Sequence, residues 1–266
     1  MSFSYKHVLL VGATAGIGKG IADRLVKEGV KVTAVGRRQD RLDKFVKEHG
    51  EAKASGIALD IGNLAAIPKF AEDVMTKSPD IDCLFLNAGV QSAADFSKPE
   101  TVDLAKFNSE ININFNSHVA LVHAFIPSLK AKGTPTGIIF RRSDDSSTGS
   151  HLAIVPAATL PAYSASKAAL NAFTLCLRDN LRNTSIKVIE LSPPVVQTEL
   201  HDYVGDRGRK MGMPLDEFTQ IAYDGLVSGS DQVIVDNPNM SMETFNSIVD
   251  NRRGAFNAMC KLIRGP

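Results

Sequence analysis

Short apolar runs alternate with longer amphipathic segments along most of this chain of 266 residues. The apolar runs predict strands at 7–11, 31–35, 55–59, 83–86, 137–140, 187–191 and 232–235. The segments between them have helical periodicity, which predicts helices at 17–28, 41–49, 65–77, 104–130 and 162–181. Strict alternation of apolar strands and helices is typical of an α/β fold in which helices cover both faces of a parallel sheet.

The alternation continues without an internal repeat, a low-complexity stretch or a linker rich in Pro and Gly. We therefore predict one domain over residues 1–266, because an α/β domain can reach this length. Residues 200–225 mix apolar and charged side chains, which favours a lid over a partly apolar substrate. Residues 241–263 have an apolar stripe with helical spacing, which predicts a C-terminal helix packed on the core or on another subunit.

Composition and charge exclude several classes of protein. Apolar residues make up 44% of the chain and charged residues 22%, as in ordinary globular proteins. The net charge of +1 gives no reason to expect nucleic acid or an anionic membrane as a partner. No apolar run reaches the roughly 18 residues of a membrane span, and the apolar start is predicted as a strand rather than a signal peptide. The three dispersed cysteines form no CxxC pair, so we expect a cytoplasmic protein without a metal site.

A glycine-rich loop follows the first predicted strand and leads into the first helix. Glycines in such a loop let the backbone approach a pyrophosphate, which the N-terminus of the helix attracts. A tight turn without a ligand is the alternative, but the place of the loop in the alternating chain favours a nucleotide site. The predicted cofactor contacts come from Gly12, Thr14, Ala15, Gly16, Ile17 and Gly18.

The second predicted strand is followed by two basic residues, Arg37 and Arg38. An NAD site usually has an acidic residue near this position to bind the ribose 2′-hydroxyl. Guanidinium groups instead match the geometry of a phosphate. The alternative is that both arginines face solvent, but we predict that they bind the 2′-phosphate of NADP(H).

A tyrosine and a lysine lie four residues apart in a predicted helix, at Tyr163 and Lys167. This spacing places both side chains on one face of the helix. A lysine cation beside a phenol favours the phenolate, and lowers the pKa of the phenol from its ordinary value of about 10. A proton donor in a chain with a nucleotide site predicts hydride transfer to a carbonyl or from an alcohol.

Several motifs make residues 6–200 resemble the short-chain dehydrogenase/reductase family. These motifs are GATAGIG at 12–18, LDI at 59–61, NAG at 87–89, the Asn of ININFNS, YSASK at 163–167 and SPPVVQT at 192–198. The resemblance implies a single-domain Rossmann fold with a doubly wound, seven-stranded parallel sheet. It also implies a homodimer or homotetramer, in which the helices with Asn114 and Tyr163 pair with their copies.

The resemblance assigns a role to each motif residue. Asp60 would contact the adenine, and Asn87, Ala88 and Gly89 would border the cofactor. The Val196 backbone would meet the carboxamide, and Thr198 would also contact the cofactor. In the active site, Tyr163 would be the general acid/base, Lys167 would bind the nicotinamide ribose, and Asn114 would hold a proton-relay water.

The chain departs from the family pattern at the catalytic serine, which usually follows the fifth strand directly. Counting back from Tyr163 selects Ser150, whereas counting forward from the strand selects Ser143, Ser146 or Ser147. We prefer Ser150, because the residues between it and Tyr163 match the family without a gap. The alternative is a misplaced hydroxyl and a cofactor-binding protein with a sensor or non-redox role.

A second departure is Pro193-Pro194, where the family usually has Pro-Gly. Proline lacks an amide donor and has a fixed φ, so we expect a less flexible rim around the nicotinamide. The sequence as a whole predicts an NADP(H)-dependent oxidoreductase that interconverts a ketone or aldehyde and an alcohol. The substrate is expected to be a small molecule of unidentified structure.

Overall fold

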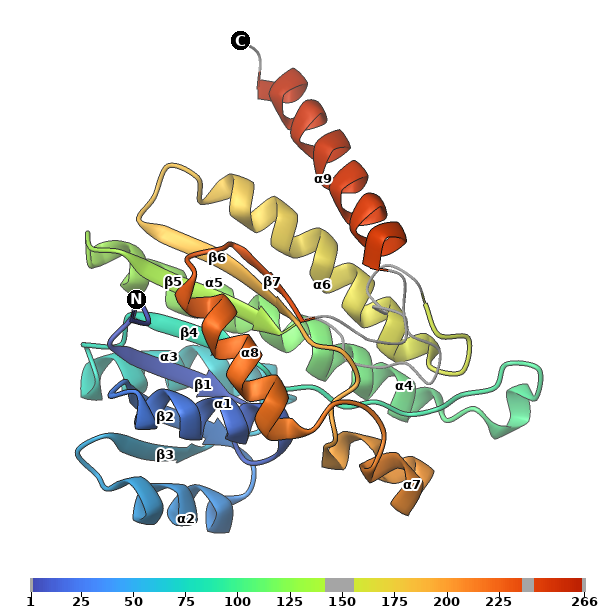
Figure 1. Ribbon diagram of the computed structural model, residues 1–266, viewed down its shortest axis with the longest axis horizontal. Helices are drawn as coiled ribbons and strands as arrows, with labels where there is room; N and C mark the ends of the chain where they lie inside the picture. Colours follow the sequence, from blue (N-terminus) through green and yellow to red (C-terminus); the bar gives the residue numbers. More distant parts are fainter. Residues whose placement is uncertain (1, 142–155, 236–241, 265–266) are drawn as a thin grey trace.

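The computed structural model describes residues 2–141, 156–235 and 242–264. Among them, seven strands form one parallel sheet with the order β3-β2-β1-β4-β5-β6-β7 (Figure 1). The strands are β1 (His7–Val11), β2 (Lys31–Gly36), β3 (Ala54–Ala58), β4 (Cys83–Leu86), β5 (Thr136–Arg141), β6 (Ile186–Ser192) and β7 (Gln232–Ile234). This topology confirms the predicted doubly wound parallel sheet of a Rossmann fold.

Helices cover both faces of the sheet. One face packs against α1 (Gly16–Lys27), α2 (Gln39–His49) and α8 (Leu215–Val227). The other packs against α3 (Ile67–Lys77), α5 (Ser117–Ala131) and α6 (Pro161–Asn180). The remaining helical segments are η1 (Leu64–Ala66), η2 (Pro99–Thr101), α4 (Leu104–Ile111), η3 (Asn112–Asn116), η4 (Glu199–Val204), α7 (Asp206–Arg209) and α9 (Met242–Arg264).

The central strand β1 separates two apolar cores. Val8 and Leu10 join the core beneath α1 and α8, whereas Leu9 and Val11 join the core beneath α3 and α5. Successive side chains of a strand point to opposite faces, so both faces of β1 are apolar and all five of its residues are buried. This explains why the strands are continuous apolar runs in the sequence.

Apart from shifts of one or two residues at the ends of elements, the structure differs from the predicted elements mainly at two places. The helix expected at 104–130 contains a π-helical segment, η3, between α4 and α5. Residues from Leu215 onward, which belong to the predicted lid, form α8, and its Phe218 is fully buried in the core beneath α1. The second half of that segment therefore packs on the sheet.

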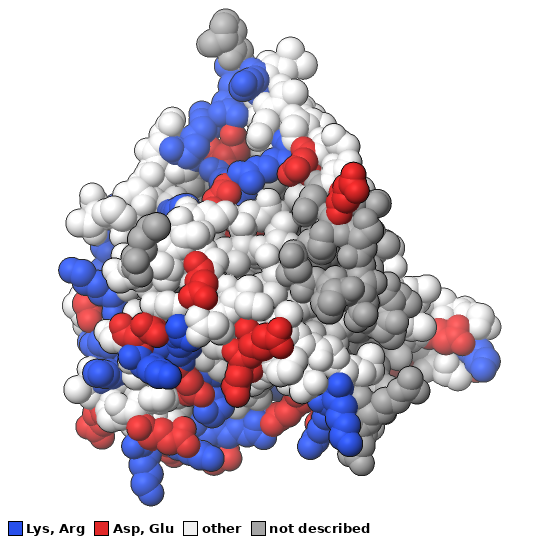
Figure 2. Space-filling model, viewed as in Figure 1, with Lys and Arg blue, Asp and Glu red and all other residues white. Residues whose placement is uncertain are grey.

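The outer surface mixes both signs of charge. Basic and acidic side chains are interspersed on the face shown in Figure 2, in keeping with the net charge of +1. The C-terminal helix α9 extends beyond the sheet from the side of α6 (Figure 1). In the part of the chain that the structure describes, no helix has both the length and the apolar content needed to cross a membrane.

The strand order reverses between β1 and β4, which are neighbours in the sheet although about 75 residues separate them. In open α/β sheets, ligands bind outside the carboxyl ends of the strands at such a reversal. The loops after β1 and β4 meet there, because the amide of Asn87 donates to Val11 O at 3.0 Å. This edge of the sheet is the first place to look for a site.

Candidate cofactor and active site

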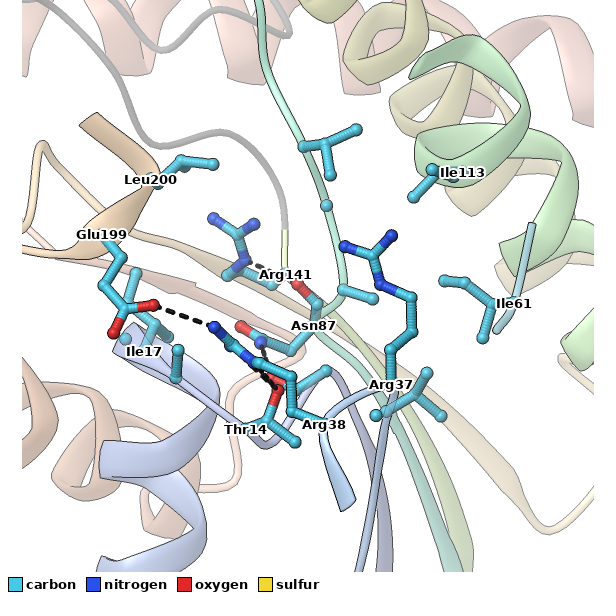
Figure 3. A pocket seen from close by; sticks show the side chains of 18 of the residues that line it. Thr14, Ile17, Arg37, Arg38, Ile61, Asn87, Ile113, Arg141, Glu199 and Leu200 are labelled. Atoms are coloured by element: carbon cyan, nitrogen blue, oxygen red, sulfur yellow. Dashed lines mark hydrogen bonds and ion pairs between the residues drawn. The ribbon is translucent and has the colours of Figure 1, made fainter. Parts of the chain in front are cut away.

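A cavity of about 470 Å³ lies at the carboxyl ends of β1, β2 and β4 (Figure 3). Most of the residues predicted to bind the cofactor line it: Gly12, Thr14, Ala15, Gly16, Ile17, Arg37, Arg38, Asp60, Asn87, Ala88, Gly89 and Thr198. Gly18 and Val196 are buried and do not line it. The loops after five different strands thus bring these residues together at one cavity.

The glycine loop needs two of its glycines for close packing. Gly12 has a φ of 87°, and its carbonyl accepts a hydrogen bond from Asn87 Nδ2 at 2.8 Å. A Cβ on Gly18 would lie 2.0 Å from that carbonyl oxygen and 2.3 Å from Asn87 Nδ2. Only a residue without a side chain lets α1 begin so close to β1 and β4.

The cavity wall has features that fit a dinucleotide. The first turn of α1 contains no acidic residue, and Ala15 at its N-cap offers no side chain to its free amides. Such amides attract a phosphate. Asn87 Oδ1 is buried and accepts no hydrogen bond from the described residues, so it can accept one from a bound molecule.

An ion-pair network lies at the β2 end of the cavity, and Figure 3 shows the part of it formed by Thr14, Arg38 and Glu199. Arg38 donates to Thr14 Oγ1 from Nε at 3.2 Å and from Nη2 at 3.0 Å, and its Nη1 donates to Glu199 Oε2 at 3.0 Å. Arg41, in the first turn of α2, donates to Glu199 Oε1 at 2.8 Å. Burial opposes ionisation of Glu199, but bonds from Arg41 and Arg38 lower its pKa overall. We name these residues the Arg38–Arg41–Glu199 network.

Arg41 and Glu199 were not among the predicted site residues. The sequence does contain a local signal for Arg41. Arg41 lies three residues after Arg38 at the start of α2, and residues three apart lie on the same face of a helix. No local pattern indicates Glu199, which is 158 residues further along the chain than Arg41.

The tyrosine and lysine lie together near the N-terminus of α6. Tyr163 is fully buried and packs against Leu160 and Ala157. Lys167 is 1% exposed, with its Nζ 5.4 Å from the centre of the Tyr163 ring. Lys167 Nζ also donates to the carbonyl of Arg141 at 3.4 Å. The pair is therefore adjacent, although neither residue lines the cavity.

Asn114 lies in the π-helical segment η3, and π-helical turns are frequent at functional sites. Its Oδ1 accepts from the amide of Val90 at 2.9 Å, and its Nδ2 donates to Val90 O at 2.8 Å. Nδ2 also lies 3.2 Å from Ser166 Oγ on α6. Asn114 thereby joins the loop after β4 to the helix of Tyr163 and Lys167.

Three polar groups converge over Gly89. A Cβ built on Gly89 would lie 3.1 Å from Arg141 Nη2, 3.4 Å from Asn114 Oδ1 and 3.8 Å from Lys167 Nζ. Arg141, at the end of β5, is 4% exposed and donates from Nε to Asn87 O at 3.0 Å. Gly89 and Arg141 line the cavity, and Lys167 Nζ lies directly behind this part of its wall.

Arg141 was also missing from the predicted site. The predicted fifth strand ended at 140, so this arginine was assigned to the following loop. Arg141 and Lys167 both lie close enough to His118, on α5, to affect its protonation. Burial, and then the charges of Lys167 and Arg141, lower the pKa of His118 to about 3.

The four candidates for the catalytic serine lie outside the described residues. Ser150, Ser143, Ser146 and Ser147 all belong to 142–155, so the choice among them stays a prediction. After β6, the segment with Pro193 and Pro194 continues beside residues 211–213. There the Met213 amide donates to Val195 O at 2.8 Å, and the Gln197 amide donates to Met213 O at 3.0 Å.

A cluster of possible metal ligands lies away from the cavity, formed by Asp23, Glu48 and His49. Lys19 Nζ lies 2.6 Å from Asp23 and 3.7 Å from Glu48, and His49 Nε2 lies 2.9 Å from Asp23. Lys19 already pairs with both carboxylates, so internal ion pairs account for the cluster.

The comparison with known proteins agrees with this geometry. The family model for short chain dehydrogenases matches residues 6–207, which is most of the chain. The chain belongs to the short-chain dehydrogenase family. As a member of this family it is an oxidoreductase, and the resemblance inferred from the motifs is confirmed.

This short-chain dehydrogenase is similar to known proteins over most of its length. It is 33% identical over 235 residues to the uncharacterized oxidoreductase DltE of Bacillus subtilis (strain 168), covering 88% of this chain and 89% of that protein. It is 33% identical over 193 residues to serine 3-dehydrogenase of Agrobacterium fabrum, covering 72% of each. The solved closed form of serine dehydrogenase complexed with NADP⁺ has a TM-score of 0.76 and 26% identity, over 88% of this chain and 96% of that one.

Proposed function

We propose that this short-chain dehydrogenase is an NADP(H)-dependent enzyme that interconverts a ketone or aldehyde and an alcohol. The main support is one cavity that joins a glycine loop and arginines at one end to Lys167 and Asn114 behind the wall at Gly89. Serine dehydrogenase complexed with NADP⁺, a similar structure, supports the same cofactor. NADP(H) would supply or accept the hydride when bound.

The residues around the cavity divide the binding of the cofactor between them. The amides at the start of α1 and the glycine loop would bind the pyrophosphate. Arg37 and Arg38 would bind the 2′-phosphate, because guanidinium groups pair well with phosphate oxygens. Asp60 would contact the adenine, with Thr198 and the Val196 backbone near the nicotinamide.

The proton would come from Tyr163 in the reductive direction. Its phenol would donate to the substrate oxygen as the hydride reaches the carbonyl carbon, so that an alcohol forms. Lys167 would stabilise the resulting phenolate and bind the nicotinamide ribose. Ser150 would hydrogen-bond the substrate oxygen, and Asn114 would support the relay that returns a proton from solvent.

A second candidate function is a cofactor-binding protein with a sensor or non-redox role. The observation in its favour is that Tyr163 is fully buried and does not line the cavity. A crystal structure with bound cofactor separates the two candidates. Hydride chemistry requires Ser150 Oγ and Tyr163 Oη within hydrogen-bond distance of one site, and their separation would favour the second role.

The proposed reaction is tested by oxidation of NADPH with a panel of ketones and aldehydes. The relatives named serine 3-dehydrogenase and NADP-dependent 3-hydroxy acid dehydrogenase suggest that oxidation assays include serine and short 3-hydroxy acids. Tyr163→Phe should lower kcat about 100-fold or more, because it removes the general acid. Turnover that survives this change nearly intact would contradict the mechanism.

The cofactor preference is tested separately by binding. We expect a lower Kd for NADPH than for NADH, and loss of this difference in the Arg37→Ala, Arg38→Ala double variant. Isothermal titration calorimetry measures both affinities without turnover. Equal affinities in the unmodified protein, or an unchanged preference in the variant, would count against NADP(H).

We also propose a homodimer or homotetramer formed through α5 and α6. The small residues Ala165, Ala168 and Ala172 are exposed on α6, so another helix can approach closely. An apolar hollow of about 790 Å³ beside them is lined by residues including Phe115, Val119 and Phe173. Light scattering at micromolar concentration should give a multiple of the 28.6 kDa chain mass, and a mass near that of one chain would contradict assembly.

A further inference from the structure

Glu199 brings a carboxylate to the arginines at the β2 end of the cavity (Figure 3). It is the first residue of η4 and follows Thr198 directly. Thr198 packs closely on the glycine loop, since a Cβ on Gly16 would lie 3.1 Å from Thr198 Cβ. The segment after β6 therefore reaches across the loop, and Glu199 forms ion pairs with Arg38 and Arg41.

The carboxylate of Glu199 uses donors that suit a phosphate. Arg38 donates from Nη1 to Glu199 and from Nε and Nη2 to Thr14 Oγ1. Arg41 Nη1 donates to both Glu199 oxygens and lies 3.2 Å from Thr14 O. A phosphate monoester has three acceptor oxygens and more negative charge than a carboxylate, so it would compete for the same guanidinium groups.

The network is exposed, so a ligand in the cavity can reach its arginines. The side chains of Arg38, Arg41 and Glu199 are 42, 37 and 45% exposed. Ion pairs that solvent reaches to this extent are weak, because water and salt screen them. Burial opposes ionisation of Glu199, but hydrogen bonds from Arg41 and Arg38 lower its pKa overall, so the charged carboxylate competes with any anion that approaches these arginines.

We infer that Glu199 is an internal competitor for the 2′-phosphate of the cofactor. It pairs with Arg38 and Arg41 when no phosphate is bound, and it releases these arginines when NADP(H) binds. This inference rests on the proposed binding of NADP(H). Glu199 thereby limits the advantage of NADP(H) over NAD(H), and it couples the segment after β6 to the phosphate.

Glu199 could instead assist phosphate binding by positioning the arginines, and this role predicts the opposite change in affinity for NADPH. If Glu199 only held the arginines in a phosphate-binding position, its charge would help NADPH to bind. The two roles therefore differ in the direction in which Glu199→Gln changes affinity. Gln keeps the size and the hydrogen-bond acceptor of the side chain but removes its charge.

The experiment is isothermal titration calorimetry of the full chain with NADPH and with NADH. Glu199→Gln should lower the Kd for NADPH about threefold to fivefold, the upper part of the range for an exposed ion pair. The Kd for NADH should change less than twofold, and added salt should reduce the gain for NADPH. The matched control is Glu217→Gln, an exposed carboxylate in the first turn of α8, which should leave both affinities unchanged.

Each other outcome contradicts a specific statement. Weaker NADPH binding by the Glu199→Gln variant, or equal changes for NADPH and NADH, would overturn the role of Glu199 as a competitor and leave the proposed cofactor intact. A Kd for NADPH no lower than that for NADH in both the unmodified protein and the Glu199→Gln variant would contradict the cofactor proposal itself. A melting curve of each variant verifies that it is folded.

Discussion

At the β2 end of the cavity, the side chains of Arg38, Arg41 and Glu199 are about two-fifths exposed, whereas Lys167 and Asn114 at the α6 end are 1% and 0% exposed. The exposed charges pair with one another through weak contacts that a ligand can replace. The buried groups are held by the fold through hydrogen bonds between different elements. Binding selectivity can therefore be adjusted at the first end, while the second is organised before any ligand arrives.

The largest effect is expected from removing the buried cation. Lys167→Met should lower kcat with NADPH about 100-fold or more, because the phenolate of Tyr163 loses its neighbouring positive charge. Steady-state kinetics measure this loss. The melting temperature should not fall, since a buried charge is costly and Met has a similar volume.

The control is Lys130→Met, which removes an exposed lysine at the end of α5. It should retain full turnover. If kcat of the Lys167→Met variant fell less than tenfold, the positive charge of Lys167 would not be needed for turnover.

A smaller effect, on stability, is expected from a substitution in the glycine loop. Gly18→Ala places a Cβ 2.0 Å from Gly12 O, so it should lower the free energy of unfolding by about 1–3 kcal/mol. Gly254→Ala, on the exposed helix α9 with nothing within 4 Å, should raise it by about 0.5–1 kcal/mol. Urea denaturation measures both, and effects of the same sign would contradict the close packing at Gly18.

A further effect is a pH dependence of stability that arises at His118, behind the buried end of the cavity. His118 has a folded pKa of about 3 and an ordinary value of 6.5, so below pH 6.5 the unfolded chain binds a proton that the folded chain does not. The free energy of unfolding should therefore fall as pH falls from 6.5 toward 3, by about 1.4 kcal/mol per unit for this one group. His118→Gln should make that slope shallower by the contribution of one proton, about 1.4 kcal/mol per pH unit.

The exposed His123 on the same helix provides the control for this slope. His123→Gln should leave the pH dependence of unfolding close to that of the unmodified protein. Urea denaturation between pH 6.5 and 5 measures the slopes, and equal slopes for the two variants would contradict the assigned protonation of His118.

Prediction from the sequence was accurate where a feature depends on residues close together in the chain, and it failed where distant residues determine the feature. The bounds of β1 and β4 were predicted to the residue, because buried strands are apolar runs with sharp polar limits. The π-helical segment η3 was not predicted, since one extra residue in a turn hardly changes helical periodicity. Local patterns therefore gave the elements but not their irregularities.

The candidate site shows the same limit. The glycine loop and the Tyr163–Lys167 pair were found because each motif lies within a few residues. Glu199 was missed because its contact with Arg38 spans 161 residues, and only the fold brings the two together. Arg141 was missed for a similar reason, since nothing near it in the sequence indicates Asn87 or Gly89.

The position of β1 between β2 and β4 also affects how the protein folds during synthesis. The first strand can pair with β2 as soon as residues 31–36 are made, but its other neighbour is made about 50 residues later. Parallel pairings over long separations form slowly, because a long loop must close first. The hydrogen bond from Asn87 to Gly12, which shapes the cavity, therefore cannot form in a nascent chain that ends before β4, so a ribosome-bound fragment of that length would have no complete cofactor cavity.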